Sequence, residues 1–255
     1  MTRVNYYKMK YLALDNFLLW VGHGSPHTTA WPQSLYYCYD LAPETREVEE
    51  VVRIISMAVR LKKHGEPLNV PKEHIKEIWE EILEAIAAYD GLDLDGYCFT
   101  EEGLRDFTEA VEEARQYVGC PARAAGDRIS HIHTYQKGEI DFYKIECEAL
   151  EAFFDSLERG SSYQEAAERC TDGGHVAYGQ IGEIIAAFTI TLLFNVWDKG
   201  MSDLFAERLK RAVEGYGELD FHELGLTEDE IEEFQGNFRE ASACLSHYRR
   251  HKEEP

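Results

Sequence analysis

The stretch EIIAAFTITLLFNVW, residues 183–197, decides the fold class. Apolar side chains fill nearly every position, so a helix formed here has no polar face to present to water. Such a helix is buried on every side of a protein core. It is also shorter than the roughly 20 apolar residues that a membrane-spanning helix needs. We therefore expect this segment to be the central helix of an all-α fold.

The segments around this helix carry apolar residues three or four positions apart, which is helical spacing. One stripe lies in the first half of the chain: Ile75, Trp79, Ile82, Ile86 and Tyr89. Another lies near the C-terminus: Ile231, Phe234, Phe238, Ala241, Leu245 and Tyr248. Together with similar stripes elsewhere, this spacing predicts a compact multi-helix bundle of about nine or ten helices.

The chain carries no signal of division into separate domains. No linker rich in Ser, Gly and Pro interrupts it, and no repeat occurs at the fixed period of a regular solenoid. We therefore expect a single all-α domain over residues 1–255. An irregular stretch after the first helix divides this domain into an N-terminal arm, residues 1–42, packed on a body, residues 43–250.

The segment over residues 129–145 allows two structures. It can form the first half of a long helix kinked at Gly138, or a small hairpin that turns at the same glycine. Ile, Thr, Tyr and Phe in this segment favour strands. We favour the helix, because regular helical spacing begins at Ile140.

The charge of the chain excludes some classes of partner. It has 48 Asp and Glu against 26 Lys and Arg, a formal net charge of −22. A field of this sign repels nucleic-acid phosphates and anionic lipid, and it attracts a basic protein surface. The six cysteines form no C-x-x-C pair, so we expect reduced thiols and a cytoplasmic location. We expect no signal peptide, since polar residues interrupt the first apolar run.

An acidic connector, YDGLDLDGYCFTEEGL at residues 89–104, resembles the calcium loop of an EF-hand. Asp93, Asp95 and Glu102 match its third, fifth and twelfth ligand positions, but the first and ninth positions lack a side-chain oxygen. A second partial match, GELDFHEL at residues 217–224, keeps only the latter half of the pattern. The alternative for both is a tight turn before a helix. We therefore expect no cofactor, with calcium as the alternative that this loop leaves open.

Two Arg–His pairs are candidates for catalysis: Arg128 with His133, and Arg169 with His175. Their spacing matches that of all-α HEPN-type ribonucleases, in which Arg binds the scissile phosphate and His acts as acid or base. With 15 Arg and ten His in the chain, about two such spacings are expected by chance. The pairs His23 with His27 and His131 with His133 could also converge with His175 on a zinc ion, as in a metal hydrolase.

These observations favour a non-enzymatic, acidic cytoplasmic protein that binds a basic protein partner. It would act as an inhibitor, as an antitoxin or immunity-type protein, or as a subunit of a larger complex. One alternative is a helical enzyme, either a HEPN-like ribonuclease or a hydrolase with a His-bound metal. A second alternative is a calcium-responsive regulator. The oligomeric state is not indicated by the sequence.

Overall fold

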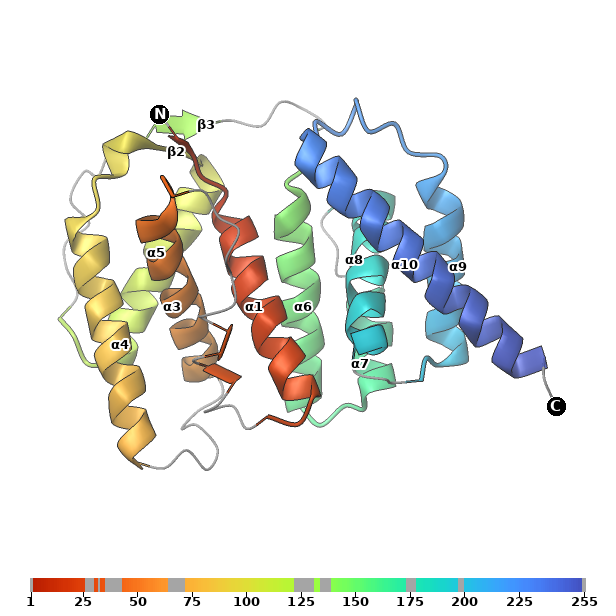
Figure 1. Cartoon of the computed structure of the whole chain (residues 1–255), viewed down its shortest axis with the longest axis horizontal. Coiled ribbons are helices and arrows are strands. Elements are labelled where there is room, and N and C mark those ends of the chain that lie inside the picture. The colour runs from red at the N-terminus through yellow and green to blue at the C-terminus, as the bar shows by residue number, and fades with distance from the viewer. Residues whose placement is uncertain are drawn as a thin grey trace. The chain divides into compact units, whose positions relative to one another are not determined.

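The computed structural model describes residues 2–25, 30–31, 33–34, 43–63, 72–121, 131–133, 139–172, 178–196 and 200–253. These residues form nine α-helices and one small three-stranded sheet (Figure 1), which confirms the all-α multi-helix bundle. The chain divides into two compact units, unit 1 over Met1–Thr134 and unit 2 over Tyr135–Pro255. The single domain expected over the whole chain stays a prediction.

In unit 1, three helices pack around helix α3, Arg46–Lys63. These three are α1 (Tyr6–Gly22), α4 (Lys72–Gly91) and α5 (Glu101–Tyr117). Asn5 begins α1, because its side chain accepts a hydrogen bond from the Lys8 N–H. The α3 residues Val48, Val52 and Ile55 are fully buried, so the apolar side of this helix forms the centre of the unit.

The sheet of unit 1 is small and parallel. Its order is β1 (Thr2–Arg3), β2 (Tyr97–Thr100) and β3 (His131–His133), with both pairs parallel. We favoured a helix for residues 129–145. This prediction is wrong at His131–His133, because their backbone pairs with β2. Among the described residues β3 has no hairpin partner, and the next helix begins only at Phe142.

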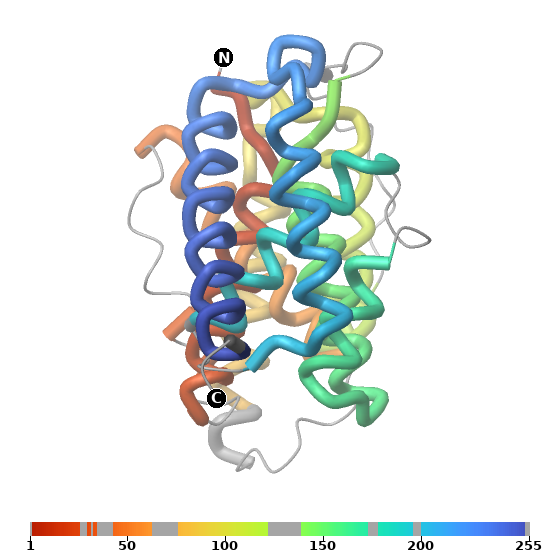
Figure 2. Tube along the Cα trace, turned by 90° about the vertical axis from the view of Figure 1, so that its right-hand side faces the viewer, coloured from red at the N-terminus to blue at the C-terminus, as the bar shows by residue number. Residues whose placement is uncertain are grey.

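In unit 2, helix α8 (Gly179–Val196) lies at the centre and contains residues 183–196 of the apolar stretch that decided the fold class. Its side chains Ile184, Ile185, Phe188 and Ile190 are all buried. The other helices are α6 (Phe142–Glu158), α7 (Tyr163–Cys170), α9 (Asp203–Tyr216) and α10 (Glu228–Glu253). Helix α8 contacts α6, α9 and α10, and Figure 2 shows α9 and α10 side by side.

The two units repeat one arrangement of helices. In unit 1, α3 contacts α1, α4 and α5, and in unit 2, α8 makes the corresponding contacts with α6, α9 and α10. Residues 76–115 align without gaps with residues 203–242, and ten of the 40 positions are identical. Residues 4–22 align in the same way with residues 140–158. The period of this repeat is about half the chain, far longer than the repeat of a solenoid.

One buried hydrogen bond occurs at the same place in both units. The Tyr7 hydroxyl donates to Asp106 Oδ2 at 2.5 Å, and the Tyr143 hydroxyl donates to Glu233 Oε2 at 2.6 Å. Burial and the neighbouring carboxylate raise the pKa of both tyrosines, so each phenol stays protonated and keeps its donor role. Each bond ties the first helix of a unit to its last helix.

An aromatic pair repeats as well. Tyr89 and Phe107 meet edge to face with ring centroids 5.1 Å apart, and Tyr216 and Phe234 do so at 5.0 Å. This geometry places the positive ring edge against the negative ring face of its partner. Because the same contacts recur at aligned positions, we interpret the two units as copies of one ancestral unit.

The copies differ where the last helix approaches the first. A Cβ atom added to Gly103 in α5 would lie 3.3 Å from the Tyr6 Cβ atom and 2.7 Å from Thr100 Oγ1. Glu230 occupies the aligned position in α10, where its carboxylate accepts hydrogen bonds from the backbone N–H and hydroxyl of Thr227. Gly103 therefore allows a close approach of α5 to α1, whereas Glu230 at the aligned position completes the cap of α10.

We expect Tyr7→Phe and Tyr143→Phe to lower the free energy of unfolding by similar amounts, about 1–3 kcal/mol each. Each change removes the hydroxyl that donates to a partly buried carboxylate. Urea unfolding followed by circular dichroism measures the effect. Tyr216→Phe is the matched control, since this hydroxyl makes no hydrogen bond with the described residues. Losses that differ severalfold would contradict the equivalence of the two bonds.

Candidate functional site

The acidic connector of unit 1 is a tight turn in which Asp93 and Glu102 have structural partners. Asp93 Oδ1 accepts a hydrogen bond from the Asp95 N–H at 3.2 Å, which begins the short 3-10 helix Leu94–Gly96. Glu102 lies 3.3 Å from the Arg105 guanidinium. These contacts describe a turn and a helix start. Calcium binding by Asp93, Asp95 and Glu102 stays a prediction.

The second acidic segment is the same connection in the other copy. Asp220 Oδ1 accepts from the His222 N–H at 2.9 Å, as Asp93 accepts from Asp95. Thr227 then begins α10 as Thr100 begins α5, each accepting a hydrogen bond from the N–H three residues later. Duplication thus accounts for the turn and the helix start that the two connectors share.

We expect Asp93→Ala to lower the free energy of unfolding by about 0.5–2 kcal/mol, because a turn-forming acceptor is lost. Asp95→Ala should change it by less than about 0.5 kcal/mol, since this side chain is exposed. Thermal unfolding with and without added Ca²⁺ checks both effects. A calcium-dependent rise in the melting temperature that Asp95→Ala abolishes would contradict the turn interpretation.

The structure does not bring the predicted catalytic pairs together among its described residues. Arg128 and His175 lie outside them, and only the backbone of His133 is described, in β3. Arg169 is exposed on α7, where its guanidinium donates to Ser161 Oγ at 3.1 Å. The ribonuclease and zinc-hydrolase hypotheses therefore stay predictions.

A stripe of buried polar residues runs along α3. The sequence did not predict this stripe. Glu49, Arg53, Ser56 and Arg60 share one face of this helix, and all four are buried. Arg53 Nη2 lies 2.5 Å from Glu49 Oε1. Burial raises the pKa of Glu49 to about 7 and lowers the pKa of Arg53 to about 10. The spacing of these polar residues, one or two turns apart, was the signal available in the sequence.

This pKa shift predicts a pH dependence of stability. The folded chain holds the Glu49 proton more tightly than the unfolded chain, where glutamate has a pKa of about 4.3. The resulting stabilisation is complete below about pH 4 and is lost as the pH rises through about 7. Glu49→Gln cannot ionise and avoids this loss.

We therefore expect the unfolding free energy of Glu49→Gln, relative to the unmodified chain, to rise between pH 5 and pH 8. The gain should be on the order of 1–3 kcal/mol, with the contact to Arg53 opposing the effect of burial. Urea unfolding at both pH values measures it. Glu47→Gln, an exposed neighbour, should show no such pH-dependent difference. Parallel pH profiles for all three chains would refute the shifted pKa.

An exposed surface on α4 combines apolar and acidic side chains. Trp79 and Leu83, one helical turn apart, are each 41% exposed. The Trp79 ring contacts Tyr117 of α5 edge to face, with ring centroids 6.2 Å apart. Glu80 and Glu84 are exposed on the same side of the helix. We call these five residues the Trp79 face.

The exposure of Trp79 corrects the predicted core stripe of this helix. Ile78, not Trp79, is buried together with Ile82, Ile86 and Tyr89. The buried stripe lies slightly to one side of the predicted one, which leaves Trp79 at its edge. Spacing of four residues places a side chain at such an edge as readily as in the centre.

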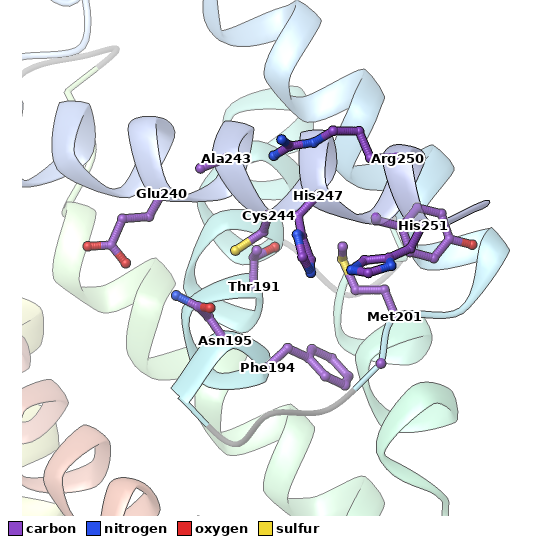
Figure 3. A pocket seen from close by; sticks show the side chains of 12 residues that line it. Thr191, Phe194, Asn195, Met201, Glu240, Ala243, Cys244, His247, Arg250 and His251 are labelled. Carbon is purple, nitrogen blue, oxygen red and sulfur yellow. The ribbon is translucent and has the colours of Figure 1, made fainter. Parts of the chain in front are cut away.

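A cavity of about 630 Å³ lies between α8, α10 and residues 200–201 of unit 2 (Figure 3). We call it the α10 cavity. The rings of His247 and His251 line it with their centroids 4.3 Å apart, and Cys244 lies one turn earlier on α10. Figure 3 shows these three side chains pointing from α10 toward α8. Burial, and secondarily Glu240, raises the pKa of the Cys244 thiol, so it is protonated at neutral pH.

The sequence did not predict this cavity, because the cavity forms only when α8 and α10 come together from distant parts of the chain. The signal available was local: HYRRH, residues 247–251, places two histidines four apart on a predicted helix.

No protein-family profile matches the sequence, and no curated protein or solved structure matches the chain. Within the described ranges, no group of three or more His, Cys, Asp or Glu side chains is arranged to hold a metal ion. None of the described helices is both long and apolar enough to cross a membrane. The function must therefore be argued from the chemistry of the Trp79 face and the α10 cavity.

Proposed function

We propose that the chain is a non-enzymatic binding protein whose Trp79 face docks a basic protein partner. The observation that carries the proposal is the exposure of Trp79 and Leu83 beside acidic side chains. Tryptophan is enriched among the residues that dominate binding energy at protein interfaces, where it fills a pocket on the partner. A partner with an apolar pocket rimmed by Lys or Arg would complement this surface.

The charge around the Trp79 face supports a basic partner. Glu80 and Glu84 flank the two apolar side chains, and Lys76, one helical turn earlier, lies 3.1 Å from Glu80. Glu84 forms no ion pair with the described residues. The whole chain adds a net charge of −22, which would speed the approach of a cationic surface.

The duplication supports a binding role for the same side chains. The positions in α9 that align with Trp79 and Leu83 hold Ala206, which is buried, and Lys210. The repeated fold therefore forms without an exposed tryptophan at this place. An apolar surface that the fold does not require is most simply explained by an interaction.

The proposal includes an inhibitor, an antitoxin or immunity-type protein, or a subunit of a larger complex, acting in the cytoplasm. The described cysteines, at positions 98, 120, 147, 170 and 244, are free thiols, which supports a reducing compartment. General nucleic-acid binding is not part of the proposal, because the negative field repels phosphate.

We expect Trp79→Ala to weaken binding of the basic partner by about 2 kcal/mol, roughly 30-fold in Kd. Basic proteins captured on the immobilised chain would be identified by mass spectrometry, and the Kd of each measured between low and high salt. Leu204→Ala is the matched control, since this side chain is 49% exposed on α9 but lies outside the Trp79 face.

Binding should weaken as salt rises, because the steering charges become screened. The proposal fails if Trp79→Ala and Leu204→Ala bind equally well. It also fails if the affinity stays constant across the salt series.

A further inference from the structure

The end of α10 has no counterpart in unit 1. Helix α5 ends at Tyr117, followed by Gly119 in the left-handed region, at φ 73°, and then Pro121. Glycine in this conformation and a following proline together terminate a helix. The aligned positions in α10 are Ser246 and Tyr248, and this helix continues to Glu253.

Both histidines of the α10 cavity lie on this extension. His247 and His251 are one helical turn apart, and their rings meet at 81° with centroids 4.3 Å apart. Neither ring forms a hydrogen bond or an ion pair with the described residues. Each ring therefore has a nitrogen lone pair available to a ligand.

This geometry suits a shared metal ion. Zinc-to-imidazole bonds are about 2.0–2.1 Å long, so two nitrogens on one tetrahedral ion lie roughly 3.3 Å apart. Two rings whose centroids are 4.3 Å apart can present one nitrogen each at that separation. Histidines four apart on a helix are a recurrent way to bind zinc from one face.

The electrostatic surroundings also favour a cation. The C-terminal end of a helix carries partial negative charge, and both histidines lie near the end of α10. Of the nearby cations, Lys252 is paired with Asp203, and Figure 3 shows Arg250 pointing away from the two rings.

We propose that His247 and His251 chelate a divalent transition-metal ion of the Zn²⁺ and Cu²⁺ class, with its remaining coordination positions open to the α10 cavity. Imidazole nitrogen selects these ions over Ca²⁺ and Mg²⁺, which require oxygen ligands. Water completes the coordination, so the metal is exchangeable. Cu²⁺ binds more tightly than Zn²⁺, following the general order of divalent affinities. This site is independent of the Trp79 face.

The test titrates ZnCl₂ or CuCl₂ into the purified full chain by isothermal titration calorimetry. One equivalent of metal should bind to the unmodified chain, and His247→Ala or His251→Ala should each weaken this binding at least about tenfold. His222→Ala is the matched control, an exposed histidine outside the cavity that should leave this affinity unchanged.

The electron paramagnetic resonance spectrum of the Cu²⁺ complex gives a second readout. It should show two coordinated imidazole nitrogens in the unmodified chain and one in either cavity variant. Circular dichroism verifies that the variants keep their helices, as expected for exposed positions. Equal affinities in the unmodified chain and all three variants overturn the proposal, as does the absence of Zn²⁺ and Cu²⁺ binding by the unmodified chain.

Discussion

The hydrogen bond from a buried tyrosine to a carboxylate is the constraint on which each unit depends. Tyr7 reaches Asp106 over 99 positions of sequence, and Tyr143 reaches Glu233 over 90. The phenol is buried and the carboxylate partly buried, so the hydrogen bond between them stabilises the unit only when the first and last helices are correctly placed. With these helices fixed, the central helix of the unit packs against both, and the connector before the last helix is held in its turn.

The fold class followed from the sequence because its strongest signal was local. The apolar residues of α8, on every side of the helix, specify a buried helix whatever surrounds them. The signal was weaker where structure depends on distant segments. His131–His133 is a strand only because β2, about thirty positions earlier, offers its backbone. Trp79 fits the spacing of a core residue, but its position at the edge of the stripe is set by the packing of α4 on α3.

The repeat and the candidate sites were hidden for related reasons. Ten identities in 40 aligned positions are too few to see without the structure, whereas the matched contacts of Tyr89 with Phe107 and Tyr216 with Phe234 are evident once it is known. The sequence shows that the polar residues from Glu49 to Arg60 are spaced to share one helix face, but it does not show that this face is buried. The α10 cavity joins α8 to the end of α10, and only the histidine pair itself was present locally.

The close approach of Gly103 to Tyr6 favours the native pairing of helices over a swapped one. Two copies of one unit in a single chain can exchange equivalent elements while they fold, a common failure of tandem proteins. A Cβ atom at position 103 would lie 3.3 Å from the Tyr6 Cβ atom, which is a tight contact. Glu230 carries a side chain at the aligned position of α10, so α10 docked on α1 in place of α5 would lie a few tenths of an ångström farther away. The swapped pair would thus lose some of the close packing of the native pair.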